Sequence, residues 1–521
     1  MLRSLGLLCI ALVDLMPLLA GAAELRLGLA LEPSSLDPHY HNYGGNRAFA
    51  PHLFEGLVRM DAQQKPMPGL ARSWVALDDT TWEFRLRPGV LFHDGTPLTA
   101  EDVAYSLARV PDVPNNPSSF NLYLGTLNKV EVVDALTLRL HTAEPEPLLP
   151  VNLSAIAILS RKNGEGAPTE SYNTGRAAIG TGPYRLISWN RGQSISLVRN
   201  DAYWGGVPDW ERVQIRFIRV PAARVAALSA GDVDAIDRVP VGDVARITED
   251  PRFRITENPS PDAIGFMLDV TDRVPPGITA SDGRLLTSNP LRNLKVRQAI
   301  NLAIDRQAIV GRIMQGHAIA TNQYMMPGEY GYSDRLPALR ADPQGAHRLL
   351  AEAGFPDGFR LTLQCQNDRF VNDAAICQAV AQMLTRAGIS AQPEVMPHAV
   401  WVGRANRREF SMFTYIWPLE TGEPSGAFRN HLVTPTRMED RSSNRGGYRN
   451  PALDALVQKA TRTIDPAQRE ALLTEAADIG FSDVALLPLH RQVDVVAYSS
   501  RFRVPQRGGG HFRAMDVEPA P

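Results

Sequence analysis

Several features that mark particular functions are missing from this sequence. It has no block of lysines and arginines and no glycine-rich phosphate loop, and its formal net charge is -2. Neither nucleic acid nor an anionic membrane is therefore indicated as a partner. The motifs H-E-x-x-H, G-x-S-x-G and S-x-x-K are also absent, so the sequence supplies no nucleophile or metal site for a hydrolase. We expect a protein that is not an enzyme and uses no cofactor.

Long apolar runs are also lacking, except at the N-terminus. Residues 5–19 form an apolar run after one arginine, and small residues (AGAA) follow it. This is the pattern of a secretory signal peptide over residues 1–23, cleaved near Ala22 or Ala23. The run is short for a bilayer span, and Cys9 lacks the small preceding residue of a lipoprotein signal. We expect export to the periplasm without an anchor, where the remaining cysteines, Cys365 and Cys377, meet oxidising conditions.

The composition is that of a soluble globular protein, with 44% hydrophobic and 21% charged residues. A chain of 521 residues exceeds the size of one core, so we expect two or three domains. A first strand over 24–31 ends at a proline-rich break, and a polar aromatic loop follows (HYHNY). Because such loops often contact ligands, Tyr40 and His41 are candidate binding residues. His39 and His41 could instead form a metal pair, but no third and fourth ligands follow at a recognisable spacing.

Residues 59–180 have the pattern of a separate α+β unit. Residues 81–87 alternate between polar and apolar side chains, and two further strands are expected within 129–142 around an Asp-Ala turn. Thr99 and Asp102 form the pattern of a helix N-cap. Short mixed strands with one helix favour an α+β insertion over a βαβ unit.

The next part of the chain follows an α/β pattern. Residues 213–236 read as strand, helix and strand, and 359–395 repeat this order with a helix over about 376–388. The loop of the second repeat follows the carboxyl end of a strand, where open α/β sheets bind ligands. Arg369 lies in this loop and could bind a carboxylate bidentately, or be an ordinary surface arginine. Cys365 and Cys377 bracket the loop, and we favour a disulfide between them over two buried thiols.

The segment 410–428 (FSMFTYIWPLETGEPSGAF) combines a buried strand with acidic residues. The strand ends at Trp417 and Pro418, and Glu420 and Glu423 follow in the loop. A carboxylate beside an indole suits an ammonium group, through charge-assisted hydrogen bonds and cation–π attraction. The alternative is a solvated acidic loop on an ordinary strand.

Six runs along the mature chain occur together in a familiar order. They are 31–38 (LEPSSLDP), 92–103 (FHDGTPLTAEDV), 180–184 (GTGPY), 199–204 (RNDAYW), 296–300 (VRQAI) and 486–489 (LLPL). In this order the chain resembles the peptide/nickel-binding family of extracytoplasmic solute-binding proteins of ABC importers, which includes dipeptide- and oligopeptide-binding proteins. The resemblance covers essentially the whole mature chain.

The resemblance implies an α/β fold of the type II periplasmic-binding-protein kind, with two lobes that close on a ligand. Lobe one would be discontinuous, an extra α+β domain would be inserted in it, and lobe two would follow. The expected bounds are 24–58 with 183–262 and 482–521 for lobe one, 59–182 for the extra domain and 264–481 for lobe two. A monomer that delivers a short peptide or a peptide-like zwitterion to the transmembrane subunits of an ABC permease is implied.

The resemblance also assigns roles to single residues. In peptide-binding relatives the acid of a W-x-x-D pattern takes the ligand's ammonium group, and here Trp417 begins W-P-L-E, so Glu420 takes that place with a longer arm. Glu423 is a nearby substitute. In dipeptide-binding relatives an arginine after the preceding βαβ strand takes the carboxylate, and Arg369 matches its position.

Three rival functions stay open at this point. Some family members bind a metal chelate or haem, for which His39, His41 and His93 would matter. A periplasmic hydrolase would need a motif that the sequence lacks. A receptor or chaperone role on the same fold is a third possibility.

Overall fold

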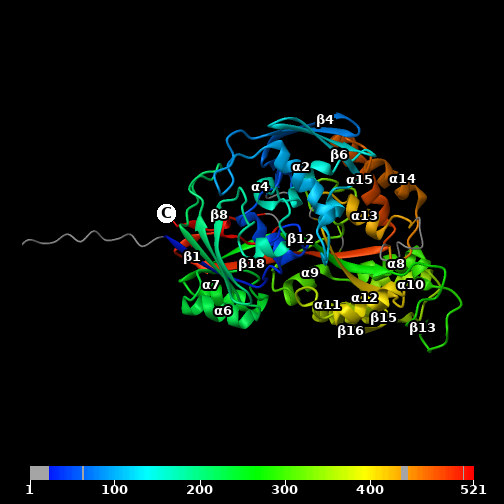
Figure 1. The fold of residues 1–521 in the computed structure, drawn as a ribbon. Coiled ribbons are helices and arrows are strands. Elements are labelled where there is room, and N and C mark those ends of the chain that lie inside the picture. Colours follow the sequence, from blue (N-terminus) through cyan, green and yellow to red (C-terminus); the bar gives the residue numbers. More distant parts are fainter. Residues whose placement is uncertain are drawn as a thin grey trace, which may run out of the picture.

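The computed structural model describes residues 23–61, 64–338, 340–419, 421–435, 444–507 and 510–520. Within these residues, twelve strands form one large sheet, and two long antiparallel strands run through its middle. These strands are β12 (Phe253–Leu268) and β18 (Leu486–Ser499), whose register shifts near Pro259 and Ile264. In Figure 1 the two strands cross from one half of the molecule to the other, so they connect the halves.

The first half of the sheet combines segments from distant parts of the chain. β1 lies between its parallel partners β10 and β11, and β11 pairs with β18. Figure 1 shows α6 and α7 below this part of the sheet. The elements are β1 (Glu24–Leu29), α1 (Gly44–Phe49), β8 (Tyr184–Asn190), β9 (Ser194–Arg199), β10 (Arg212–Phe217), α6 (Pro221–Ala230), β11 (Ala235–Ile236) and α7 (Val241–Glu249). The predicted order of strand, helix and parallel strand is confirmed in β10, α6 and β11, and Gly231 ends α6 with a φ of 76°.

The additional α+β unit is confirmed as a separate four-stranded antiparallel sheet, in the order β4-β5-β7-β6. The capping box between Thr99 and Asp102 starts α2, as the sequence predicts. Trp82, Phe84 and Leu86 of β5 point into its core. Its elements are β2 (Val58–Met60), β3 (Pro66–Pro68), β4 (Ala71–Asp78), β5 (Thr81–Leu86), α2 (Ala100–Arg109), β6 (Leu127–Asp134), β7 (Thr137–Thr142), α3 (Leu149–Asn152), α4 (Arg161–Gly164) and α5 (Thr169–Asn173).

The second half contains the second predicted βαβ unit. β15 pairs in parallel with β16, and α11 connects them along the chain. β17 lies between β15 and β12 in the sheet. The elements are β13 (Ile278–Ala280), α8 (Leu294–Ala303), α9 (Arg306–Ala308), β14 (Ala318–Ala320), α10 (Pro343–Glu352), β15 (Phe359–Gln366), α11 (Asp373–Arg386), β16 (Ser390–Met396), α12 (His398–Asn406), β17 (Met412–Pro418), α13 (Ser425–His431), α14 (Pro451–Ala460) and α15 (Pro466–Ser482).

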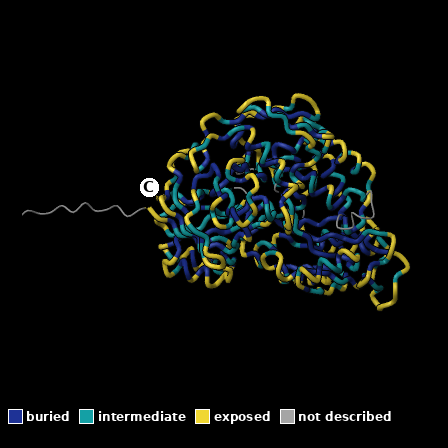
Figure 2. The backbone as a smooth tube through the Cα atoms, viewed as in Figure 1, coloured by how far each residue is buried: buried dark blue, intermediate teal, exposed yellow. Residues whose placement is uncertain are grey.

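The hydrophobic core is divided among these parts. One cluster surrounds β1 and β10, one fills the additional unit, and two lie on the faces of the second half, where Phe266 and Phe428 belong to different clusters. Figure 2 shows the strands through the middle as largely buried and the outer loops as exposed. Among the described helices, none combines the length and the apolar composition that a membrane crossing needs.

The C-terminal tail is held more firmly than its composition suggests. Its glycines and prolines suggest a loosely held segment, but residues 510–520 pack against the first half. The indole of Trp210 donates a hydrogen bond to the carbonyl of Val517 at 2.8 Å, and the amide of Ala514 donates to His52 Nε2 at 3.1 Å. Two short strands, β19 (Phe502–Arg503) and β20 (Glu518–Pro519), pair with each other. Tertiary hydrogen bonds, which local composition does not reveal, hold this segment.

Candidate functional site

A cleft of about 1990 Å³ lies between the two halves and the additional unit. Its walls come from the loop after β1, the segment before α7, the loop after β15, the middle of β12 and β18, and the C-terminal segment. Among the described residues, nine arginines line it against six aspartates and glutamates. The cleft is therefore positive on balance, although the whole chain has a formal net charge of -2.

Two carboxylates stand on the long central strands. Asp262 belongs to β12 and Asp494 to β18, and both line the cleft together with Ser260. Burial raises the pKa of Asp494, while the positive charge of Arg238 and a hydrogen bond from Gln492 act in the opposite direction. An ammonium group arriving beside such a carboxylate would favour its charged form and receive a charge-assisted hydrogen bond.

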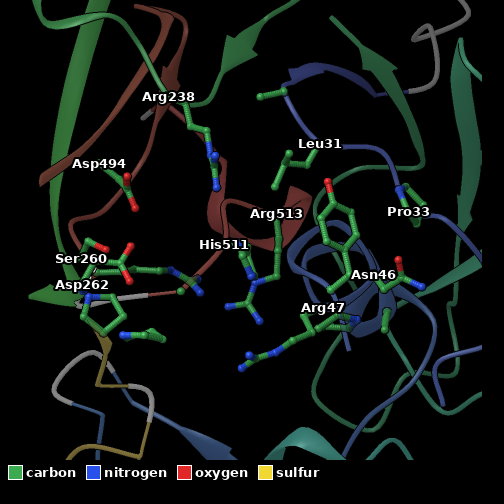
Figure 3. A pocket seen from close by; sticks show the side chains of 18 of the residues that line it. Leu31, Pro33, Asn46, Arg47, Arg238, Ser260, Asp262, Asp494, His511 and Arg513 are labelled. Atoms are coloured by element: carbon green, nitrogen blue, oxygen red, sulfur yellow. Dashed lines mark hydrogen bonds between the residues drawn. The ribbon is translucent and has the colours of Figure 1, made fainter. Parts of the chain in front are cut away.

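Basic side chains gather on the first half of the molecule. Figure 3 shows Asp494, Ser260 and Asp262 on one side of the space and His511, Arg513 and Arg47 on the other, with Arg238 reaching in from above. Burial, and then the charges of Arg47, Arg238 and Arg513, lower the pKa of His511 to about 3. The imidazole of His511 is therefore neutral at physiological pH, and the positive charge in this region belongs to the arginines.

Arg369 lies in the loop between β15 and α11 and lines the cleft from the second half. Its backbone amide donates to the carboxylate of Asp373 at 2.9 Å, which fixes the loop at the start of α11. The side chain is exposed, and we find no hydrogen bond or ion pair from its guanidinium to another residue in the described part of the chain. Its role as a carboxylate ligand remains a prediction.

A disulfide joins Cys365 at the end of β15 to Cys377 in α11, with 12 residues of sequence separation. Both cysteines are fully buried. The bond closes the segment that carries Arg369, so it limits the movement of that loop relative to the strand and the helix.

The acidic loop after β17 carries the two glutamates that the sequence suggests as ammonium ligands. Glu420 lies outside the described residues, so its role as an ammonium ligand remains a prediction. Glu423 is 3% exposed and accepts a hydrogen bond from Arg469 Nε at 2.9 Å, and Ser425 also donates to it. Because an internal arginine already pairs with this carboxylate and Glu423 does not line the cleft, its position does not support a role as a substitute ligand.

Strand alternation places Trp417 away from the cleft. Its neighbours Ile416 and Pro418 line the cleft, whereas Trp417 packs on the other face of β17. Its indole makes an edge contact with the ring of His431, whose centroid is 5.0 Å away. The sequence indicates where the strand ends, but it does not reveal which of its faces meets the cleft.

Of the two candidates in the loop after β1, only His41 borders the cleft. His41 Nδ1 lies 2.9 Å from Ser34 Oγ, its ring stacks on Tyr43 at 5.3 Å, and burial lowers its pKa. Tyr40 does not line the cleft, and its amide closes a turn with the carbonyl of Asp37 at 3.2 Å. The role of Tyr40 in ligand contact is therefore not supported by its position.

Two of the three histidines that a metal ligand would use, His39 and His93, are engaged with the backbone. His39 Nε2 is 2.8 Å from the carbonyl of Ala157, and His93 Nε2 is 3.0 Å from that of Gly182. Burial lowers the pKa of each ring to about 4. Within the part of the chain that the structure describes, no group of three or more histidine, cysteine, aspartate or glutamate side chains is arranged to hold a metal ion.

Several cleft residues escape detection in the sequence. Asp262 and Asp494 lie in unremarkable strand patterns far apart in the chain, and they line the same cleft because β12 pairs with β18. Arg238 and Arg513 follow no motif.

The chain belongs to the bacterial extracellular solute-binding proteins, family 5. The middle region that defines this family matches residues 65–438, which is most of the chain. Members of this family bind solutes as components of transport systems. Over 507 residues the chain is 27% identical to the glutathione-binding protein GsiB of Escherichia coli O1:K1 / APEC, with 95% of each chain covered.

Solved structures share the fold. HbpA2 from Haemophilus parasuis superposes with a TM-score of 0.82 at 24% identity, covering 96% of this chain and all of the other. The unliganded open form of the murein tripeptide-binding protein MppA gives 0.80 at 21% identity, over 96% and 98% of the two chains. DppA from Helicobacter pylori in complex with the peptide STSA gives 0.73 at 22% identity, over 96% and 99%. The fold is thus that of a type II periplasmic binding protein with an additional α+β unit, as the sequence predicts.

Proposed function

We propose that this protein captures a short peptide or a peptide-like zwitterion in the cleft and delivers it to the transmembrane subunits of an ABC permease. The observation that carries the proposal is the polarity of the cleft. Carboxylates on β12 and β18 are suited to an ammonium group, and arginines on both halves are suited to carboxylates. A zwitterion carries both an ammonium group and a carboxylate, so it complements both kinds of cleft residue. Each charge-assisted contact contributes about 1.5–3 kcal/mol.

The relatives narrow the ligand class. GsiB is named for glutathione, a tripeptide with one ammonium group and two carboxylates. A neighbour solved with a tetrapeptide and another with the dipeptide Met-Leu share the fold. A cleft of about 1990 Å³ is larger than such solutes require, as expected for halves that stand apart before they close.

We infer that closure bends β12 and β18. These strands cross between the halves, and their register is interrupted near Pro259 and Ile264, where bending disturbs fewer ladder hydrogen bonds. A ligand that touches both halves binds the closed state better and shifts the equilibrium toward it.

We propose domain bounds that agree with closure about β12 and β18. Lobe one would comprise 24–58, 183–262 and 482–521, the extra domain 59–182, and lobe two 264–481. The proposed limit at 262–264 falls inside β12, which is the position expected for a hinge strand shared by both lobes. We also propose export as a monomer to the periplasm, with cleavage near Ala22 or Ala23.

The test is to identify the solute that the protein carries. Protein purified from the periplasm without refolding is denatured in acid, and the released small molecules are analysed by tandem mass spectrometry. We expect a peptide or peptide-like zwitterion at near-stoichiometric amount. A metal chelate, a haem or an uncharged solute in that role would overturn the proposal.

A further inference from the structure

A buried arginine holds the segment before α7 in the conformation that directs Arg238 into the cleft. Arg224 is 2% exposed, and its guanidinium donates to the carbonyls of Ile218 at 2.7 Å, Asp237 at 3.0 Å and Arg238 at 2.9 Å. Arg238 itself has a φ of 49°, a left-handed conformation that residues with a side chain rarely adopt. Such strain persists where the surroundings impose it, and it is concentrated at functional sites.

The side chain that this arrangement presents is the guanidinium of Arg238. Among the described residues, we find no hydrogen bond or ion pair to the guanidinium of Arg238, which reaches into the open space of Figure 3. The charge of Arg238 acts on the carboxyl of Asp494, which also lines this space, and burial raises the pKa of that carboxyl. The other nearby acid, Asp237, accepts from the amide of Ala30 at 2.8 Å and lies 3.5 Å from Arg224.

Arg513 supplies a second donor on the same space, and in Figure 3 His511 lies between it and Arg238. It lies on the C-terminal segment, 3.5 Å from Asp516, which it shares with Arg507. Its Nε is buried without a hydrogen-bond partner in the described structure. Two arginines thus share one carboxylate at this point, and His511 between the basic groups is neutral. Positive charge is therefore in excess at this point, and the buried Nε–H of Arg513 lacks an acceptor among the described residues.

We infer that Arg238 and Arg513 form a carboxylate subsite in the first half, separate from Arg369 in the second. With both subsites filled and an ammonium group at Asp262 and Asp494, the preferred solute is a peptide-like zwitterion with two carboxylates and a net negative charge. This inference rests on the proposed function and adds to it the charge of the solute. Planar guanidinium groups suit carboxylates because they donate two parallel hydrogen bonds.

The test compares matched ligands that differ by one carboxylate. The probes are alanyl-glutamate against alanyl-glutamine, and reduced glutathione against its glycine ethyl ester, titrated calorimetrically into the stripped full-length mature protein. We expect the dicarboxylate member of a pair that binds to be favoured about 10- to 100-fold. In the variant Arg238→Gln this preference should fall to within about threefold, and Arg238→Lys should restore part of it by keeping the charge.

A matched control separates the subsite from the general charge of the cleft. Arg191 also lines the cleft, but its guanidinium lies 3.6 Å from Glu170 and 4.5 Å from the ring of Trp189. Arg191→Gln should therefore keep the preference. Equal binding within both pairs, or an unchanged preference in Arg238→Gln, would overturn the inference while leaving the proposed function intact. Binding of none of the four probes, with a non-zwitterionic solute in the purified protein, would overturn both.

Discussion

Arg469 and Glu423 form a buried ion pair in the second half, with Arg469 Nε 2.9 Å from Glu423 Oε2. Burial raises the pKa of Glu423, and the charge of Arg469 opposes that shift. Glu423 lies in the loop after β17, where the sequence suggests a ligand-binding acid, and Arg469 lies in α15. We therefore expect this glutamate to support the fold rather than to contact the solute.

Glu423→Ala should reduce stability without changing the affinity for the solute. The substitution leaves the Arg469 guanidinium buried without its counter-charge, which costs about 3–5 kcal/mol. Urea unfolding measures the loss. Glu352→Ala is the control, because Glu352 pairs with Lys295 at 2.8 Å on the exposed surface and should hardly move the urea midpoint. A stable Glu423→Ala protein that has lost its ligand would contradict this assignment.

Arg369→Ala should weaken solute binding about 10- to 100-fold, since its guanidinium lines the cleft and the loss removes a charge-assisted contact. The melting temperature should not change, because the side chain is exposed. Arg386→Ala at the exposed end of α11 is the control. The same titration of Glu420→Ala tests the other residue that the resemblance assigns, and normal binding in both variants would remove them from the site.

Stability should fall as the pH is lowered from about 6.5 to about 4. His52 Nε2 accepts from the amide of Ala514 at 3.1 Å while its Nδ1 faces the carbonyl of Phe49 at 2.9 Å, an arrangement that only the neutral ring satisfies. Burial lowers the pKa of His52 to about 4, and His93 has the same pKa and accepts from the amide of Gly180 at 3.2 Å. The folded state binds fewer protons than the unfolded state in this window. The stabilising contribution is complete above about pH 6.5 and is lost as the pH falls toward the folded pKa.

The measurement is the free energy of unfolding at several pH values for the wild type and His52→Gln. Each histidine contributes a slope of about 1.4 kcal/mol per pH unit within the window. The variant should be less stable at neutral pH but should show a shallower slope, while the surface variant His347→Gln keeps the slope of the wild type. Equal slopes in all three proteins would contradict the role of His52.

Removing the disulfide should destabilise the second half. Replacing Cys365 and Cys377 by serine opens a loop of 12 residues of separation, and the chain-entropy effect is about 3 kcal/mol. Weaker solute binding should accompany this change, because the Arg369 loop gains freedom that binding must remove. Intact mass before and after reduction shows whether the bond is formed, and a double-serine variant with unchanged stability would argue against its role.

The fold was predictable where local chemistry determines it. The cap at Thr99, the alternation in β5 and the left-handed glycine at the end of α6 are each set by a few neighbouring residues. The resemblance of short runs then supplied the arrangement of the parts. The local patterns and the short runs can both be recognised in one sequence, because neither depends on contacts between distant residues.

The cleft was less predictable, because its chemistry depends on pairs that are far apart in the chain. Arg469 pairs with Glu423 from 46 residues away, and the acids of β12 and β18 line the same cleft because the two strands pair. Arg238 is presented by the hydrogen bonds of Arg224 rather than by any motif. In each case a distant residue determines where a charged side chain lies, and the residues next to it in the sequence do not show this.

Small-angle X-ray scattering of the stripped mature protein, with and without its identified solute at saturation, tests the central claim most directly. If two lobes close over β12 and β18 on a zwitterion, the radius of gyration should decrease on addition of solute, and Arg369→Ala should need more solute for the same decrease. An unchanged scattering curve at saturating, calorimetrically verified occupancy would contradict the account, because the protein would then bind its solute as one rigid body.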